Sequence, residues 1–89
     1  MGDYTREKWD KYPFERGGMI DSLQEQYEFI GMTEQELKEV LGEPNRIFER
    51  DHCIIYQYVV GGVFKERNAY DFIFEHGIVV DNSFSQTRD

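Results

Sequence analysis

The 89-residue sequence has little cysteine and a deficit of positive charge. A single cysteine, Cys53, excludes an internal disulfide framework and a cysteine-rich zinc site. It lies in the apolar run CIIYQYVV, where we expect a small, buried side chain. With 10 Lys and Arg against 18 Asp and Glu, the net charge is −8 and no basic stripe is visible, so we expect no nucleic-acid partner.

Long hydrophobic runs are also missing. The apolar stretches are too short to cross a bilayer, so this segment is not expected to insert into a membrane. No signal-peptide or lipidation pattern is visible in the sequence, and its residues alone predict no compartment. The length predicts one domain over residues 1–89 with a thin core.

The N-terminal part of the chain carries mixed signals. Residues 1–17 are polar with isolated aromatics and are predicted to be an N-terminal arm, either one or two helical turns or a frayed segment. Paired glycines, which disfavour helix, interrupt the chain at its end. Apolar residues then recur every four positions from Met19 to Tyr27, which predicts a first helix at about 18–28.

The stretch GMTEQELKEVLGEPNR, residues 31–46, predicts a second helix with both of its ends marked. Thr33 is a good N-cap, and Glu36, three residues later, can complete a capping box. Gly42 can adopt a positive φ at the C-terminus, and Pro44 prevents continuation. The two helices form a predicted helical layer over residues 18–45.

After Asn45 the sequence favours β-structure, because β-branched and aromatic residues become frequent. The predicted sheet spans residues 46–84, with a short tail at 85–89. The strand candidates are RIFER, CIIYQYVV, AYDFIFE and IVVDNSF. In AYDFIFE, the aromatic residues Tyr70, Phe72 and Phe74 share one face, and Asp71, Ile73 and Glu75 share the other. We expect the aromatic residues to form the face that the helices cover.

These elements together predict an α+β fold with two layers. Two helices pack on one face of a three- or four-stranded antiparallel meander, in the order ααβββ. Because the helices cover only one face of the sheet, the other face is expected to remain open to water or to a partner.

The segments IGMTEQELKEVLGEPNR, YQY and DFIFEHGIVVD resemble the SmpA/OmlA (BamE-like) family of small envelope proteins. The chain is closer to uncharacterised relatives of that family than to its outer-membrane lipoproteins. The resemblance implies a β-lactamase-inhibitor-protein-like fold and a role in binding another protein. It also implies a location in the cell envelope; without it we expect the cytoplasm. The matching positions are Gly31, Met32, Thr33, Leu37, Leu41, Gly42, Pro44, Phe74, Gly77 and Val79.

Residues that could carry chemistry are sparse. The triplet DHC at 51–53 suggests a metal, but two histidines and one cysteine are too few for a zinc site. Asp71 and Glu75 share a predicted strand face but are too far apart to share a proton. We therefore expect no catalytic, metal or cofactor-binding residue and no enzymatic activity.

The aromatic content is the most informative feature, with seven Phe, six Tyr and one Trp. We expect a non-enzymatic protein-interaction module that uses the open sheet face and its loops. The sequence does not decide between a contiguous patch on that face and scattered exposure. The predicted contact residues are Gln57, Val59, Phe64 and Ile73, with Ile55 on the same face.

An alternative is a small-ligand binding or sensing domain with a cleft between helices and sheet. Trp9, Tyr56 and Tyr58 would then supply stacking surfaces. We expect a monomer or a weak dimer, because exposed strand edges favour pairing of two copies. The charged residues Arg46, Arg50 and Asp81 protect those edges.

Overall fold

A computed structural model describes residues 3–62 and 66–88. Four strands form one antiparallel sheet in the order β1-β2-β3-β4, and the helices precede it in the chain. The elements are α1 Arg6–Lys11, the 3₁₀ helix η1 Pro13–Met19, α2 Ile20–Gln26, α3 Glu34–Leu41, β1 Arg46–Arg50, β2 Cys53–Gly61, β3 Glu66–Glu75 and β4 Ile78–Arg88.

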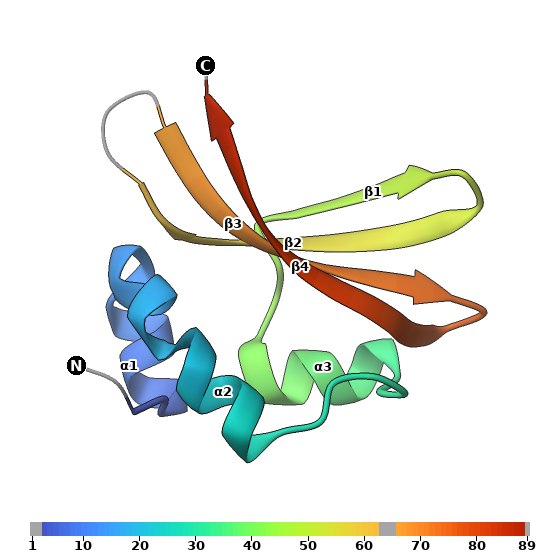
Figure 1. Ribbon diagram of the computed structural model, residues 1–89. Coiled ribbons are helices and arrows are strands. Elements are labelled where there is room, and N and C mark those ends of the chain that lie inside the picture. The colour runs from blue at the N-terminus through green and yellow to red at the C-terminus, as the bar shows by residue number, and fades with distance from the viewer. Residues whose placement is uncertain (1–2, 63–65, 89) are drawn as a thin grey trace.

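The predicted α+β class is confirmed. The helices lie together on one side of the sheet, and no described element lies on its opposite side (Figure 1). Consecutive strands are neighbours throughout, so the sheet is the expected meander. The sheet is strongly twisted, so that β1 and the C-terminal end of β4 point in clearly different directions (Figure 1).

Of the two alternatives predicted for the N-terminal residues, the helical one is found within residues 3–17. α1 is capped by the Thr5 hydroxyl, which accepts from the Lys8 N–H at 3.1 Å. The helix predicted at 18–28 is shorter, covering only Ile20–Gln26, and η1 precedes it from Pro13 through the paired glycines. Burial of Trp9 and Met19, both 0% exposed, outweighs the low helix propensity of this segment.

The predicted capping box of α3 is confirmed. The Thr33 hydroxyl accepts from the Glu36 N–H at 3.1 Å, and the Glu36 carboxylate accepts from the Thr33 N–H at 2.9 Å. The helix ends at Gly42, whose φ is 80°. This local hydrogen bonding fixes where α3 starts and therefore which residues face the sheet.

Both outer hairpins turn through residues with positive φ. Asp51 and His52 have φ of 52° and 69°, and His76 and Gly77 have φ of 54° and 84°. Two central residues with positive φ match the twist of antiparallel strands. The sheet extends further than predicted, since β4 continues to Arg88 by pairing with β3, so the expected tail from residue 85 is largely strand.

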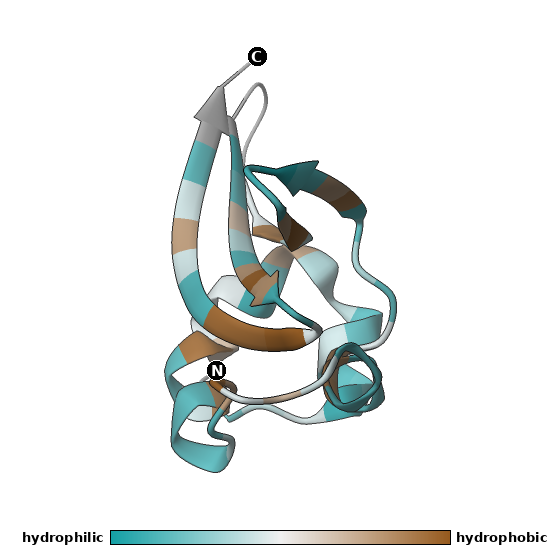
Figure 2. Cartoon of the chain, turned by 90° about the vertical axis from the view of Figure 1, so that its right-hand side faces the viewer, coloured by the Kyte–Doolittle hydropathy of each residue, from teal (hydrophilic) through white to brown (hydrophobic). Residues whose placement is uncertain are grey.

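The core lies between the helices and one face of the sheet. Tyr70, Phe72 and Phe74 are buried there, as predicted. Figure 2 shows β4 hydrophobic at its start, where Val79 is buried in the core and Ile78 and Val80 are exposed, and mixed toward its end. The other members of the core cluster are Tyr4, Trp9, Met19, Leu23, Phe29, Leu37, Leu41, Tyr56, Tyr58, Val60 and Val79.

Candidate protein-interaction face

The side of the sheet opposite the helices, here called the uncovered face, is defined by strand alternation. Residues with even numbers in β2 and β3, such as Tyr56 and Phe72, point into the core. Residues with odd numbers point the other way. The register aligns the latter into rows across the strands, and one row joins Phe48, Ile55 and Ile73.

This row is apolar and partly shielded from solvent, although no described helix covers it. Ile55 is only 6% exposed, and its row neighbours Phe48 and Ile73 are half-buried. Directly opposed side chains on one sheet face lie close enough to cover each other. The uncovered face therefore has a small apolar centre whose side chains are shielded mainly by one another.

Two arginines flank this centre on β1. The guanidinium carbons of Arg46 and Arg50 lie 5.2 and 5.4 Å from the centroid of the Phe48 ring. This distance is within the range of cation–π attraction. The stacking holds both cations at the edge of the sheet beside the apolar row.

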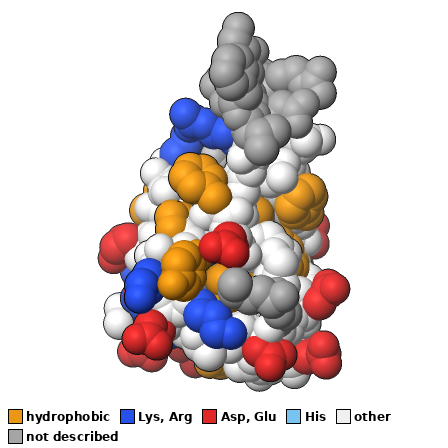
Figure 3. Space-filling model, turned by 90° about the vertical axis from the view of Figure 1, so that its left-hand side faces the viewer, with side chains coloured by type: hydrophobic (Ala, Val, Ile, Leu, Met, Phe, Trp, Pro, Cys, Tyr) orange, Lys and Arg blue, Asp and Glu red, His pale blue; other side chains and the backbone are white. Residues whose placement is uncertain are grey.

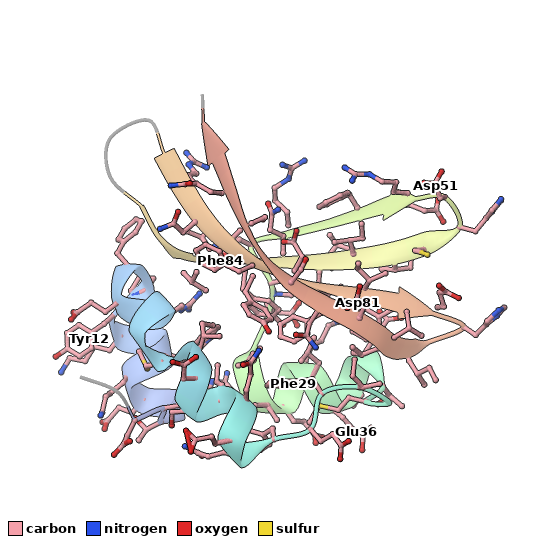
Figure 4. The ribbon with its side chains drawn as sticks, in the orientation of Figure 1. Tyr12, Phe29, Glu36, Asp51, Asp81 and Phe84 are labelled. Atoms are coloured by element: carbon pink, nitrogen blue, oxygen red, sulfur yellow. The ribbon has the colours of Figure 1, made fainter. Side chains whose placement is uncertain are left out.

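Carboxylates lie on the opposite half of the uncovered face, on β3 and β4. Asp71 accepts from the Ser85 hydroxyl through Oδ2 at 3.4 Å, while its Oδ1 is buried and has no hydrogen-bond partner among the described residues. Asp81 lies on β4, in the same row as Ile73 (Figure 4). The uncovered face is thus cationic along β1, while β3 and β4 carry the carboxylates Asp71, Glu75 and Asp81, with one cation, Arg67, near the start of β3.

Cys53 also belongs to this face, where it is half-buried, so the expectation of a buried core cysteine is wrong. Its Sγ lies 3.8 Å from Oε2 of Glu75. Desolvation first, and then the Glu75 carboxylate, raise the pKa of the thiol. Alternation along β2, and not the hydrophobicity of its neighbours, decides which way Cys53 points.

The predicted contact residues fall as follows. Gln57, Val59 and Ile73 all lie on the uncovered face and are half-buried. The backbone of Val59 is fixed, because its N–H donates to Asn45 Oδ1 at 2.8 Å and its carbonyl oxygen accepts from Arg16 at 3.2 Å. Phe64 lies outside the described residues.

The sequence reasoning did not identify Phe48, and it assigned Arg46 and Arg50 only to edge protection. The available signal was the alternation in RIFER, which places all three side chains on one strand face. Outside this face, exposed apolar side chains are carried by separate elements. Figure 3 shows the α1 end of the molecule, where such side chains are interspersed with charged ones. Among the described residues, the exposed large apolar residues outside the uncovered face are Tyr12, Phe14, Ile30, Ile47 and Phe84. Ile78 is opposite Glu75 in register, at the end of the uncovered face, and Val80 lies at the irregularity between β3 and β4.

The residues considered for metal binding do not converge. His52 and His76 belong to different hairpin turns. Within residues 3–62 and 66–88 there is no group of three or more His, Cys, Asp or Glu side chains suited to hold a metal ion. Asp71 and Glu75 share the uncovered face as predicted, separated by Ile73.

The aromatics considered for a ligand cleft are part of the core. Trp9, Tyr56 and Tyr58 are at most 1% exposed, and the space between α2 and the sheet is too small for a water molecule. Burial raises the pKa of Tyr58, and burial with a hydrogen bond to Glu34 raises that of Tyr56. A separate depression of about 510 Å³ is open to solvent and is lined by residues 24–29 and Asn82.

The described helices are all too short or too polar to span a membrane. A comparison of the chain with known protein families, curated proteins and solved structures finds no match.

Proposed function

We propose that this chain is a non-enzymatic protein-interaction module that binds another protein through its uncovered face. The observation that carries the proposal is the row of apolar side chains Phe48, Ile55 and Ile73. These side chains are partly shielded from solvent on a face that no described helix covers. An apolar centre bordered by charged residues is the usual composition of a transient protein interface.

The arrangement of charge supports the same function. Cations on β1 and carboxylates on β3 and β4 separate positive from negative charge across the face. The electrostatic field of this arrangement orients a complementary partner as it approaches. The rigid sheet holds these groups in place, which reduces the entropy lost on binding.

The resemblance to SmpA/OmlA extends the proposal to a partner in the cell envelope. It rests on the residues quoted above, chiefly those of the capping box and the last hairpin. Fractionation and intact mass of the endogenous protein test this part separately. Recovery with the envelope fraction supports it, and recovery of an unprocessed protein from the soluble fraction contradicts it.

Photo-crosslinking in the cells that produce the protein tests the interaction itself. A benzophenone amino acid replaces Gln57 on the uncovered face or, as the matched control, Ile30, which is 52% exposed on a loop. We expect an adduct of one discrete mass from position 57 and none from position 30. Absence of an adduct from 57, or equal adducts from both positions, contradicts the proposal.

A second variant tests whether the apolar centre provides the contact. Ile73→Lys with Gln57→Lys places two charges on the uncovered face without changing the core face of β2 and β3. The crosslink, with the benzophenone placed at Val59, is expected to disappear while the far-ultraviolet circular dichroism stays unchanged. Phe14→Lys with Ile30→Lys is the matched control, because it adds the same charge at exposed apolar positions elsewhere.

A further inference from the structure

β1 is an edge of the sheet and pairs only with β2. It has five residues, and all of them except Phe48 are exposed. A strand in this position presents unpaired N–H and C=O groups along its outer side, to which another extended segment can hydrogen-bond. The Arg-Phe-Arg edge, made of Arg46, Phe48 and Arg50, lies on the same strand.

The side chain of neither arginine in the Arg-Phe-Arg edge makes an ion pair or a hydrogen bond with the described residues. Stacking on Phe48 orders the planar guanidinium groups but leaves their N–H donors available. Such groups bind carboxylates with two parallel hydrogen bonds.

The carboxylates nearest in register do not neutralise this edge. Asp71 is in the row of Arg46 and Asp81 in the row of Phe48, two and three strands away, or about 10 Å or more. Glu75 contacts Cys53, the register partner of Arg50, and makes no ion pair with that arginine. Glu49 points to the opposite face of β1, and Asp51 lies in the adjoining turn. The edge is therefore a local cationic site on an acidic protein.

We propose that the Arg-Phe-Arg edge binds an extended acidic segment of the partner protein, which adds to the sheet as a fifth strand beside β1. Arg46 and Arg50 are four residues apart on one face, so their Cα atoms are separated by about 13 Å. A strand paired with β1 meets them with side chains of the same spacing. The segment therefore has an acidic residue opposite each arginine and an apolar residue opposite Phe48, in the pattern acidic-x-apolar-x-acidic. This inference rests on the proposed function and specifies its partner.

A second copy of this chain fits the edge less well. Antiparallel pairing of β1 with β1, in the register that joins all five residues, places Arg46 of one copy opposite Arg50 of the other. Like charges directly opposite each other destabilise a strand pair. Carboxylates in the same positions stabilise it, so an acidic segment is the preferred occupant.

The test is a nuclear magnetic resonance titration of the full chain with blocked peptides. The probe is TETVTET, and its matched control is TKTVTKT, which differs only in the sign of its charges. We expect saturable shifts of the amide signals of residues 46–50 with the acidic peptide and none with the lysine peptide. The shifts are expected to weaken at high salt because the contacts are exposed ion pairs.

Charge-reversal variants assign the effect to the two arginines. Arg46→Glu with Arg50→Glu is expected to weaken binding of the acidic peptide by about tenfold or more and to create binding of the lysine peptide. Lys8→Glu with Lys11→Glu is the control, because it makes the same change in net charge on α1, where Lys11 is exposed and Lys8 is half-buried. It is expected to leave the titration unchanged.

Several results would overturn the inference. These are no shift at 46–50, equal binding of both peptides, or a loss of binding in the α1 control as large as that in the β1 variant. Sedimentation that shows pairing of two copies through β1, with no peptide effect, would assign the edge to self-association instead.

The crosslink from position 57 separates this inference from the proposed function. A crosslink that persists in Arg46→Glu with Arg50→Glu leaves the proposed function standing and overturns the acidic-strand inference. Peptide binding at β1 without any crosslink in cells supports the acidic-strand chemistry and contradicts the proposed function.

Discussion

The indole N–H of Trp9 donates to the carbonyl oxygen of Leu41 at 3.0 Å, joining α1 to the last residue of α3. Both residues are almost completely buried. The neighbouring Tyr58 hydroxyl donates to the carbonyl oxygen of Gly42 at 2.8 Å, so two core aromatics satisfy carbonyl groups at the end of the same helix. The N-terminal segment is thus part of the core and not an appendage.

Replacing Trp9 by Phe tests this connection. The substitution leaves the Leu41 carbonyl buried without its partner, and we expect a loss of about 1–3 kcal/mol in the free energy of unfolding, measured with urea. The lost ring volume adds to it. Tyr12→Phe, at an exposed position on the same segment, is expected to change stability by less than about 0.5 kcal/mol. Similar effects of both substitutions would contradict burial of the indole.

Replacing Thr33 by Ala removes the hydroxyl that caps α3. We expect a loss of about 1 kcal/mol, because the Glu36 N–H at the start of the helix then lacks its acceptor. Thr33→Ser keeps the oxygen and is expected to retain most of the stability. Urea denaturation of the three proteins measures the difference, and equal losses in both variants would exclude a capping role.

Replacing His52 by Gly is expected to stabilise the protein by about 0.5–1 kcal/mol, since a φ of 69° strains a residue with a Cβ atom. Gly77→Ala, in the other hairpin, is expected to have the opposite sign. No atom lies within 4 Å of the added Cβ there, so its cost comes from the backbone alone. Thermal or urea unfolding measures the free energy of unfolding of both variants. A change of the same sign in both would contradict the role of positive φ at these two turns.

Stability is expected to fall at alkaline pH because of Tyr4. Desolvation, followed by the influence of Tyr27, raises the pKa of Tyr4 from 10.0 to about 12. The unfolded chain therefore loses this proton at lower pH than the folded chain. The contribution of the protonated Tyr4 hydroxyl to the free energy of unfolding is complete below pH 10 and is lost as the pH rises toward 12.

Urea unfolding between pH 8 and 12 measures this dependence, and Tyr4→Phe is expected to reduce its slope. The variant also lacks the hydrogen bond from the Tyr4 hydroxyl to the Val40 carbonyl, so its stability is lower below pH 10 as well. Identical slopes for the two proteins would show that Tyr4 does not titrate differently in the folded state.

The parts of the fold that were predictable from sequence are those fixed by neighbouring residues. The capping box of Thr33 and Glu36 needs only a spacing of three, and the turn at Gly77 needs one glycine between two apolar runs. Alternation likewise predicted which side of β3 is buried. Each of these signals is contained within about ten residues.

The extents of α1, η1 and α2 could not be predicted in the same way, because the stability of these helices comes from residues far along the chain. Trp9 packs near Tyr58, and Met19 belongs to the same core cluster. The end of β4 was missed because SQTR is polar, and only pairing with β3 makes it a strand. On the candidate face, alternation predicted the position of Ile73, whereas the stacking of two arginines on Phe48 depends on side-chain geometry.

The link between Trp9 and Leu41 also has a consequence for the order of assembly. A helix of six residues is not stable on its own, and the groups that bury its tryptophan come from α3 and the sheet. During synthesis α1 therefore waits for a strand that is made about fifty residues later. The burial of Trp9 follows the arrival of α3 and β2, and the fluorescence of this single tryptophan reports when α1 packs onto them.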